Sequence, residues 1–160
     1  MNTYNSIFDF QNKKTIITIG TFDGVHLGHK KILEKITSNA QQLNCEGTVL
    51  TFFPHPRMVI QNVEPLKLLN TIEEKKLLLE SFGIANLIIH PFDKEFSQLS
   101  AEDFVKKILV EQLQIQKIII GYDHRFGTNR SADINDLIVF GKKYGFEVEQ
   151  IEAQEIDEIA

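Results

Sequence analysis

The 160-residue sequence contains a single cysteine, Cys45, and no tryptophan. One cysteine cannot form a disulfide within the chain, and such sparing use is typical of cytoplasmic proteins. No apolar run approaches the roughly 20 residues that a membrane-spanning helix requires. Residues 1–14, MNTYNSIFDFQNKK, lack the apolar stretch of a signal peptide. We therefore expect a cytoplasmic location.

A basic stripe is also missing from the sequence. The formal net charge is −5, and the lysine pairs are scattered along the chain and mostly adjoin acidic residues, as on solvated helix faces. Proteins that bind nucleic acids usually carry clustered positive charge. We therefore expect no nucleic-acid partner, and the sequence leaves the oligomeric state open.

Strand-like and helix-like segments alternate along the chain. Residues 15–20, TIITIG, are rich in β-branched side chains and end in glycine, as a buried strand does. Thr71 with Glu74, and Ser100 with Asp103, resemble the N-terminal caps of helices. Strands are expected at 15–20, 47–53, 86–90, 117–121 and 146–151, and helices at 27–43, 71–82, 100–112 and 133–143.

This alternation predicts one α/β domain over residues 1–160. The expected architecture is a Rossmann-like, doubly wound, parallel five-stranded sheet with helices on both faces. In such folds ligands bind at the carboxyl ends of the strands, where the strand order reverses. The segments 21–29, 54–70 and 122–131 read as loops, and they follow the first, second and fourth strands. We expect these loops to converge on one crevice.

Two common phosphate-binding fingerprints are absent from the first of these loops. Residues 20–29, GTFDGVHLGH, match neither G-x-G-x-x-G nor G-x-x-x-x-G-K-[ST]. They place His26 and His29 on one face of a helix start, where free N–H groups and the helix dipole favour phosphate. Gly28 between them leaves room for a close ligand. The alternatives are histidines that only pack or lie on the surface, and a zinc site that lacks convincing further ligands.

The same loop resembles the first signature of the H-x-G-H nucleotidylyltransferases. Its T-F-D-G-V-H form is similar to that of the bacterial FAD synthetases, which also carry riboflavin kinase activity. Three other segments resemble the same family in the same order: 51–57, TFFPHPR, resembles F-x-P-H-P; 99–105, LSAEDFV, resembles L-[ST]-P-E-x-F-[VI]; and 121–127, GYDHRFG, resembles G-x-[DN]-F-x-F-G. His124 stands where the family usually has phenylalanine.

The resemblance implies that the phosphate of FMN attacks the α-phosphorus of ATP, giving FAD and pyrophosphate. Because that phosphate is already anionic, positioning and charge stabilisation would dominate catalysis. Mg²⁺ would bind largely through the substrate phosphates, with no metal ligand from the protein. His26 and His29 would be the catalytic residues, binding the ATP phosphates and stabilising charge as pyrophosphate leaves.

The resemblance also implies two sets of binding residues. The ATP-binding set is Gly20, Phe22, Asp23, Gly28, Asp123 and Gly127. The FMN-binding set is Pro54, His55, Pro56 and Arg57. The alternative interpretations are structural, with prolines that stiffen a turn, a surface charge at Arg57, and a turn or helix-entry residue at Asp123. His90, at the end of an expected strand, is expected to be structural.

A second signature of the family, [IV]-S-S-[TS]-x-I-R, does not occur in the sequence. It would follow the fifth strand, where its hydroxyls and arginine would bind the triphosphate. We therefore expect a piece of a longer protein with a riboflavin kinase domain, and weak or no turnover, because losing such groups costs about a hundredfold in rate. Two alternatives remain, a non-catalytic nucleotide-binding module and another H-x-G-H nucleotidylyltransferase.

Overall fold

The computed structural model describes residues 1–11, 13–20, 27–52, 66–121 and 132–151, with the backbone alone for 27–29 and 66–72. The strands are β1 (Asn2–Tyr4), β2 (Thr15–Ile19), β3 (Glu46–Phe52), β4 (Asn86–His90), β5 (Ile115–Gly121) and β6 (Glu147–Ile151). The α-helices are α1 (Leu27–Leu43), α3 (Leu66–Ser81), α4 (Lys94–Ser97), α5 (Ala101–Asp103) and α6 (Ile134–Tyr144). A 3₁₀ turn, η1 (Ile7–Asp9), and a π-helical segment, η2 (Phe104–Gln112), complete the described elements. None of these helices is long and apolar enough to cross a membrane.

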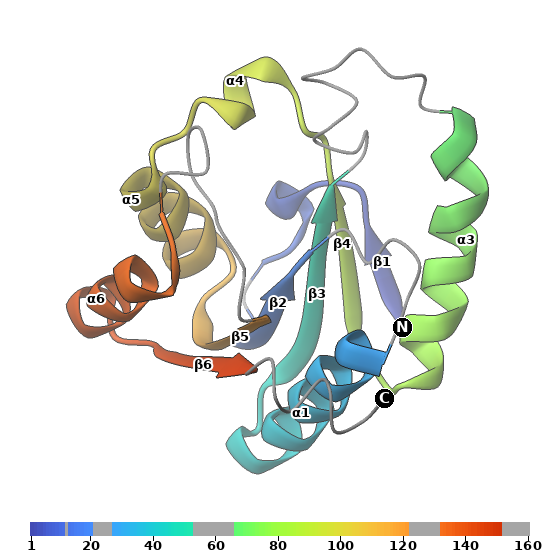
Figure 1. Ribbon diagram of the computed structural model, residues 1–160, viewed down its shortest axis with the longest axis horizontal. Helices are drawn as coiled ribbons and strands as arrows, with labels where there is room; N and C mark the ends of the chain where they lie inside the picture. The colour runs from blue at the N-terminus through green and yellow to red at the C-terminus, as the bar shows by residue number, and fades with distance from the viewer. Residues whose placement is uncertain (12, 21–26, 53–65, 122–131, 152–160) are drawn as a thin grey trace.

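The strands form one parallel sheet in the order β1-β4-β3-β2-β5-β6 (Figure 1). From β2 the chain moves outward to β3 and β4, and then returns to the other side of β2 to form β5 and β6. The strand order therefore reverses between β2 and β5. This is the switch point of a doubly wound sheet.

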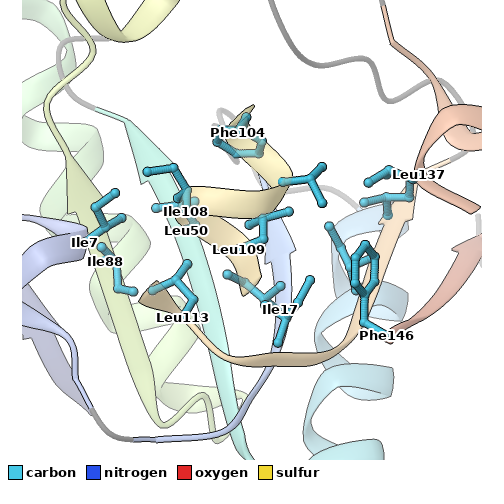
Figure 2. Packing of buried hydrophobic residues seen from close by; sticks show 14 of the residues in the cluster. Ile7, Ile17, Leu50, Ile88, Phe104, Ile108, Leu109, Leu113, Leu137 and Phe146 are labelled. Carbon is cyan, nitrogen blue, oxygen red and sulfur yellow. The ribbon is translucent and has the colours of Figure 1, made fainter. Parts of the chain in front are cut away.

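Helices cover both faces of the sheet. Adjacent residues of a strand point to opposite faces, so that they enter two separate apolar clusters. The face towards α1 and α3 receives Ile16, Val49, Leu87 and Ile119. The other face, towards η1, η2 and α6, receives Ile17, Leu50, Ile88 and Ile118. Figure 2 shows the second cluster, in which Ile17, Leu50 and Ile88 lie against side chains of η2. The predicted doubly wound α/β fold is confirmed.

The number of strands is a correction, because the prediction of five misses β1. This strand has three residues, pairs with β4 at the sheet edge, and is largely exposed. Its sequence, Asn-Thr-Tyr, has neither an apolar run nor a long alternation. The turn η1 and the short helix α4 were likewise not predicted.

The start of the second helix is also a correction. The predicted capping box of Thr71 and Glu74 is wrong, because α3 begins at Leu66 and Thr71 lies inside it. Residues 66–70, the last five of the predicted loop 54–70, therefore belong to α3. Pro65 in the sequence was interpreted as part of a loop, although proline is also tolerated at the start of a helix.

Other boundaries match their predicted signals. Ser100 Oγ accepts a hydrogen bond from the Asp103 amide at 3.1 Å, and this cap opens α5, which continues into η2. Asp133 caps α6. Gly83 has a φ of +80°, a left-handed conformation that glycine adopts readily, and it follows the end of α3.

Candidate active site

The carboxyl ends of β2, β3 and β5 lie side by side in the sheet, since β2 is hydrogen-bonded to both of the others. The Gly20 amide donates to the Leu50 carbonyl at 3.1 Å, which continues the pairing of β2 and β3 beyond Ile19. On the other side the last described pair between β2 and β5 is Ile17 with Ile118. Gly20 directly follows β2, and Gly121 is the last residue of β5, so that a glycine stands at the end of each strand that flanks the switch point.

Helix α1 is the next described element after β2 and begins at Leu27. Its first turn includes Gly28 and the backbone of His29. The first N–H groups of a helix have no intrahelical partner and carry the positive end of the dipole. The first turn of α1 contains no acidic residue that would neutralise this charge. The helix start therefore has the electrostatics of an anion site.

Most of the predicted site residues lie outside the described residues. These are Phe22, Asp23, His26, Pro54, His55, Pro56, Arg57, Asp123 and Gly127, together with the side chain of His29. Their roles stay predictions. The strands that precede them are described, and the strand ends at Gly20, Phe52 and Gly121 belong to adjacent strands. The strand ends from which the three segments depart are therefore adjacent, and the convergence of the segments on one crevice stays a prediction.

An aromatic cluster lies at the carboxyl ends of β3 and β4, and the sequence analysis missed it. The Phe96 ring of α4 lies 5.4 Å from Phe52, 5.8 Å from Phe92, 4.8 Å from His90 and 6.0 Å from Phe104, between ring centroids. Such tilted and edge-to-face pairs add to the stabilisation from burial. The 12 phenylalanines of the sequence were the available signal, but they do not show which rings meet. The cluster fixes α4 and η2 beside the strand end that precedes residues 54–57.

His90 within this cluster is structural, as expected. Its side chain is buried, and its Nδ1 accepts a hydrogen bond from the Ile7 amide at 3.1 Å, which ties η1 to β4. Burial lowers the pKa of His90 below its ordinary value, and the nearby Asp93 only partly opposes this effect. The imidazole is therefore neutral, and its Nδ1 lone pair is occupied by the backbone.

The free energy of unfolding is expected to fall as the pH drops below about 6.5, the ordinary histidine pKa. Because the pKa of His90 is lower in the folded chain, the unfolded chain takes up the proton first. The stabilisation is fully present above that pH and is lost as the pH falls towards the folded pKa. Urea unfolding of the wild type and His90→Gln at about pH 7.5 and about pH 5.5 measures this. Glutamine keeps an acceptor but does not titrate, so an equal difference between the two proteins at both pH values would contradict the assignment.

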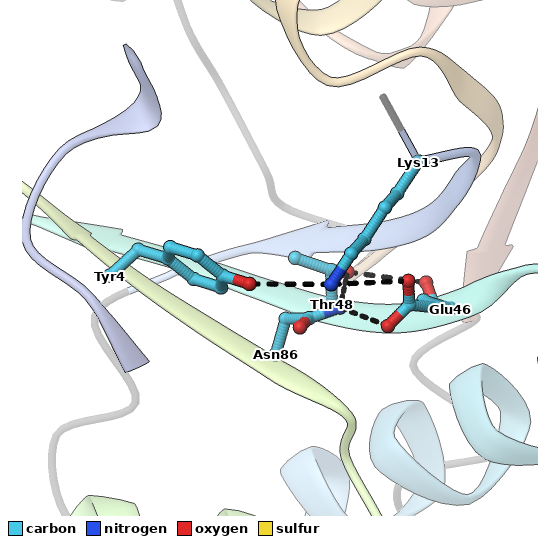
Figure 3. A network of polar contacts seen from close by, with 5 residues as sticks. All are labelled: Tyr4, Lys13, Glu46, Thr48 and Asn86. Atoms are coloured by element: carbon cyan, nitrogen blue, oxygen red, sulfur yellow. Dashed lines mark hydrogen bonds and ion pairs between the residues drawn. The ribbon is translucent and has the colours of Figure 1, made fainter. Parts of the chain in front are cut away.

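A polar cluster lies at the opposite, amino end of the sheet, where β3 and β4 begin (Figure 3). The buried Asn86 donates from Nδ2 to Glu46 Oε1 at 3.2 Å and to Thr48 Oγ1 at 3.4 Å. Lys13 Nζ lies 3.6 Å from Glu46 Oε2 and donates to the Tyr4 hydroxyl at 3.4 Å. These contacts join the first residues of β3 and β4 to Tyr4 at the end of β1 and to Lys13, which precedes β2. The cluster ties the sheet together at the edge remote from Gly20 and Gly121, and so it is not the candidate active site.

Comparison with known proteins adds the family relationship. A family model described as FAD synthetase matches residues 9–160. A bifunctional riboflavin kinase/FMN adenylyltransferase from Buchnera aphidicola subsp. Schizaphis graminum (strain Sg) is 39% identical over 140 residues, which are 88% of this chain and 45% of that protein. The protein of the same name from Escherichia coli (strain K12) is 32% identical over 133 residues, 83% of this chain and 42% of that protein. The chain thus spans less than half the length of these relatives.

Solved structures are also similar to the chain, and one of them covers most of it. The crystal structure of a macrolide-efflux protein from Streptococcus pneumoniae has a TM-score of 0.75 at 23% sequence identity. The similarity covers 93% of this chain and 56% of that one. At this level of identity the likeness concerns the fold, and it supports the Rossmann-like class.

Proposed function

The chain belongs to the FAD synthetase family, and we propose that it acts as an FMN adenylyltransferase. It joins the AMP part of ATP to FMN and gives FAD and pyrophosphate. The observation that carries this proposal is the switch point between β2 and β5, with Gly20 directly after the first strand and Gly121 at the end of the second. Parallel α/β sheets bind nucleotides at such a point, and helix starts such as that of α1 favour phosphate.

We assign the catalytic roles to His26 and His29. Both would donate hydrogen bonds to the ATP phosphates and stabilise the charge that develops as pyrophosphate leaves. The nucleotide would lie against Gly20, Phe22, Asp23 and Gly28 on one side, and against Asp123 and Gly127 on the other. The flavin phosphate would bind near Pro54, His55, Pro56 and Arg57, in the segment that follows β3.

The reaction needs no covalent intermediate on the protein. An oxygen of the FMN phosphate forms a bond to the α-phosphorus of ATP as the bond to pyrophosphate breaks, with the two oxygens in line. Magnesium enters with the triphosphate as part of the substrate and neutralises its charge. The protein's contribution is to hold both phosphates in position and to supply hydrogen-bond donors.

The proposal extends to the setting of the domain. Residues 1–160 act as one adenylyltransferase domain, and in the bifunctional relatives we assign the adenylyltransferase part of the name to the matched segment. The riboflavin kinase activity would belong to the remainder of those proteins. We propose a cytoplasmic location, since the single cysteine forms no disulfide within the chain and both substrates are charged metabolites.

Single-turnover chromatography tests the proposed reaction. With the protein in molar excess over FMN, and with MgATP present, we expect FAD and pyrophosphate in equal amounts. CTP in place of ATP, or phosphopantetheine or nicotinate mononucleotide in place of FMN, is expected to give no product. Product from one of those pairs would assign the chain to a different H-x-G-H reaction. Binding of ATP without any product, also in a longer chain that includes the second signature, would favour a nucleotide-binding module instead.

A further inference from the structure

A closed ring of polar contacts joins helix α1 to strands β5 and β6, across the switch point from β2. The Glu149 carboxylate on β6 bonds to Lys35 Nζ of α1 through Oε2 and to Lys117 Nζ of β5 through Oε1, the second contact at 2.9 Å. Lys117 Nζ also donates to Asn39 Oδ1 of α1 at 2.9 Å. Asn39 Nδ2 in turn donates to the Lys35 carbonyl at 2.7 Å, which closes the ring. We name Lys35, Asn39, Lys117 and Glu149 the α1 clasp.

The α1 clasp is partly shielded from water. The exposed fractions of the side chains are 29% for Lys35, 28% for Glu149 and 13% for Lys117. Burial raises the pKa of Glu149, but the hydrogen bonds and charges of the two lysines outweigh it, so that the pKa lies below its ordinary value. The carboxylate is therefore charged at neutral pH, and its bonds are stronger than those of a fully solvated pair.

The clasp and the apolar core hold α1 in different ways. Ile32, Leu33 and Ile36 pack into the cluster formed with β2 and β3, and such packing is not directional. The clasp acts on the side of β5 and β6, across the switch point, and hydrogen bonds have defined directions. Packing therefore sets how closely α1 approaches the sheet and which face it turns to it, and the clasp adds a directional restraint on rotation of the helix about its own axis.

The rotation of α1 matters because of what its first turn carries. Lys35 lies six residues after His29, which corresponds to about 9 Å along a regular helix. A helix moves largely as a unit over this length, so that a rotation at Lys35 also turns Gly28 and the start of the helix. Misplacement of a catalytic group by about 1 Å can lower a rate by up to about 100-fold.

We propose that Glu149 is a positioning residue for the adenylyl transfer: through Lys35 it fixes the rotation of α1, and with it the direction of the phosphate-binding helix start. This inference rests on the proposed function. Glu149 itself touches no substrate in this scheme. A solvated ion pair without this role would contribute little to stability and would leave catalysis unchanged.

Glu149→Ala provides the test, with Glu102→Ala as its matched control. Glu102 bonds to Lys143 Nζ at 2.7 Å and is also a carboxylate–lysine pair, but this pair joins α5 to α6. We expect kcat/KM for ATP to fall about tenfold in Glu149→Ala and to stay within about twofold of the wild type in Glu102→Ala. Glu149→Gln keeps an acceptor for a lysine and is expected to recover part of the loss.

A second readout does not depend on turnover. In the ligand-free protein, the amide resonances of Gly28 and His29 are expected to shift in Glu149→Ala and to stay in place in Glu102→Ala. If neither the wild type nor a longer chain that includes the second signature forms FAD, the proposed function fails, and these amides still decide whether Glu149 orients the helix. Unchanged amides, or equal kinetic constants in the two variants, would overturn the proposal and leave the clasp as a structural ion pair.

Discussion

The rate of FAD formation is expected to fall by about 100-fold or more when His29 is replaced by alanine. The residue belongs to the first turn of α1, next to Gly28. A donor directed at the departing pyrophosphate stabilises charge that is larger in the transition state than in bound ATP. Its loss should therefore lower the single-turnover rate constant more than it weakens ATP binding.

The control for this variant lies on the same helix. Glu34 is exposed, and Glu34→Ala is expected to leave the single-turnover rate constant within about twofold of the wild type. His29→Asn keeps a side-chain N–H and is expected to fall between the wild type and His29→Ala. Equal rate constants for His29→Ala and the wild type would remove this histidine from the catalytic assignment.

The second large effect is expected at Gly141, where valine should lower the free energy of unfolding by about 3 kcal/mol. Gly141 is buried where α6 packs on the start of β6, and a Cβ there would stand 2.6 Å from the Phe146 carbonyl oxygen. That carbonyl cannot move freely, because the Phe146 amide bonds to the Gly141 carbonyl and the next residue, Glu147, pairs with Lys117. The helix would have to move away from β6, and packing in this part of the core would be lost.

Urea unfolding measures this effect, with Lys142→Val as the comparison. Lys142 is exposed and adjacent in α6, so that the same side chain is added there without a buried clash. We expect that variant to lose less than about 1 kcal/mol, the difference in helix propensity. Equal losses for the two variants would mean that the close approach of α6 to β6 is not required.

Element boundaries were predictable where a chemical signal stands at the boundary itself. Ser100 and Asp133 are caps whose side chains accept backbone N–H groups of the following turn, and Gly83 has the left-handed conformation that a helix end requires. These are local interactions, and a local pattern is enough to reveal them. The alternation of strands and helices was likewise enough for the doubly wound class, because covering both faces of a parallel sheet leaves few other arrangements.

Features that depend on distant residues were not predictable. The three residues of β1 form a strand only because β4 offers an edge, and Lys35 meets Glu149 across 114 positions of the sequence. The Ile7 amide finds His90 across 83 positions. Periodicity and composition describe neighbours along the chain, so that they carry no information on such pairs.

The site was predictable to the extent that it rests on strand order. Segments with unusual sequence were seen to follow three strands, and adjacency of β2, β3 and β5 brings their ends together at Gly20, Phe52 and Gly121. The side-chain roles came from the family resemblance alone. The surroundings of the site could not be predicted, because the Phe96 cluster and the α1 clasp are assembled from separate elements.

Amide chemical-shift mapping with MgATP tests the central claim most directly, namely that the nucleotide binds at the carboxyl edge beside the start of α1. We expect saturable shifts at Gly20, Gly28 and Gly121, which stand at that edge or in the first turn of α1. The amino-edge residues Thr48 and Asn86 are predicted to stay in place. Shifts confined to the amino edge, or no shifts at millimolar MgATP, would contradict the account.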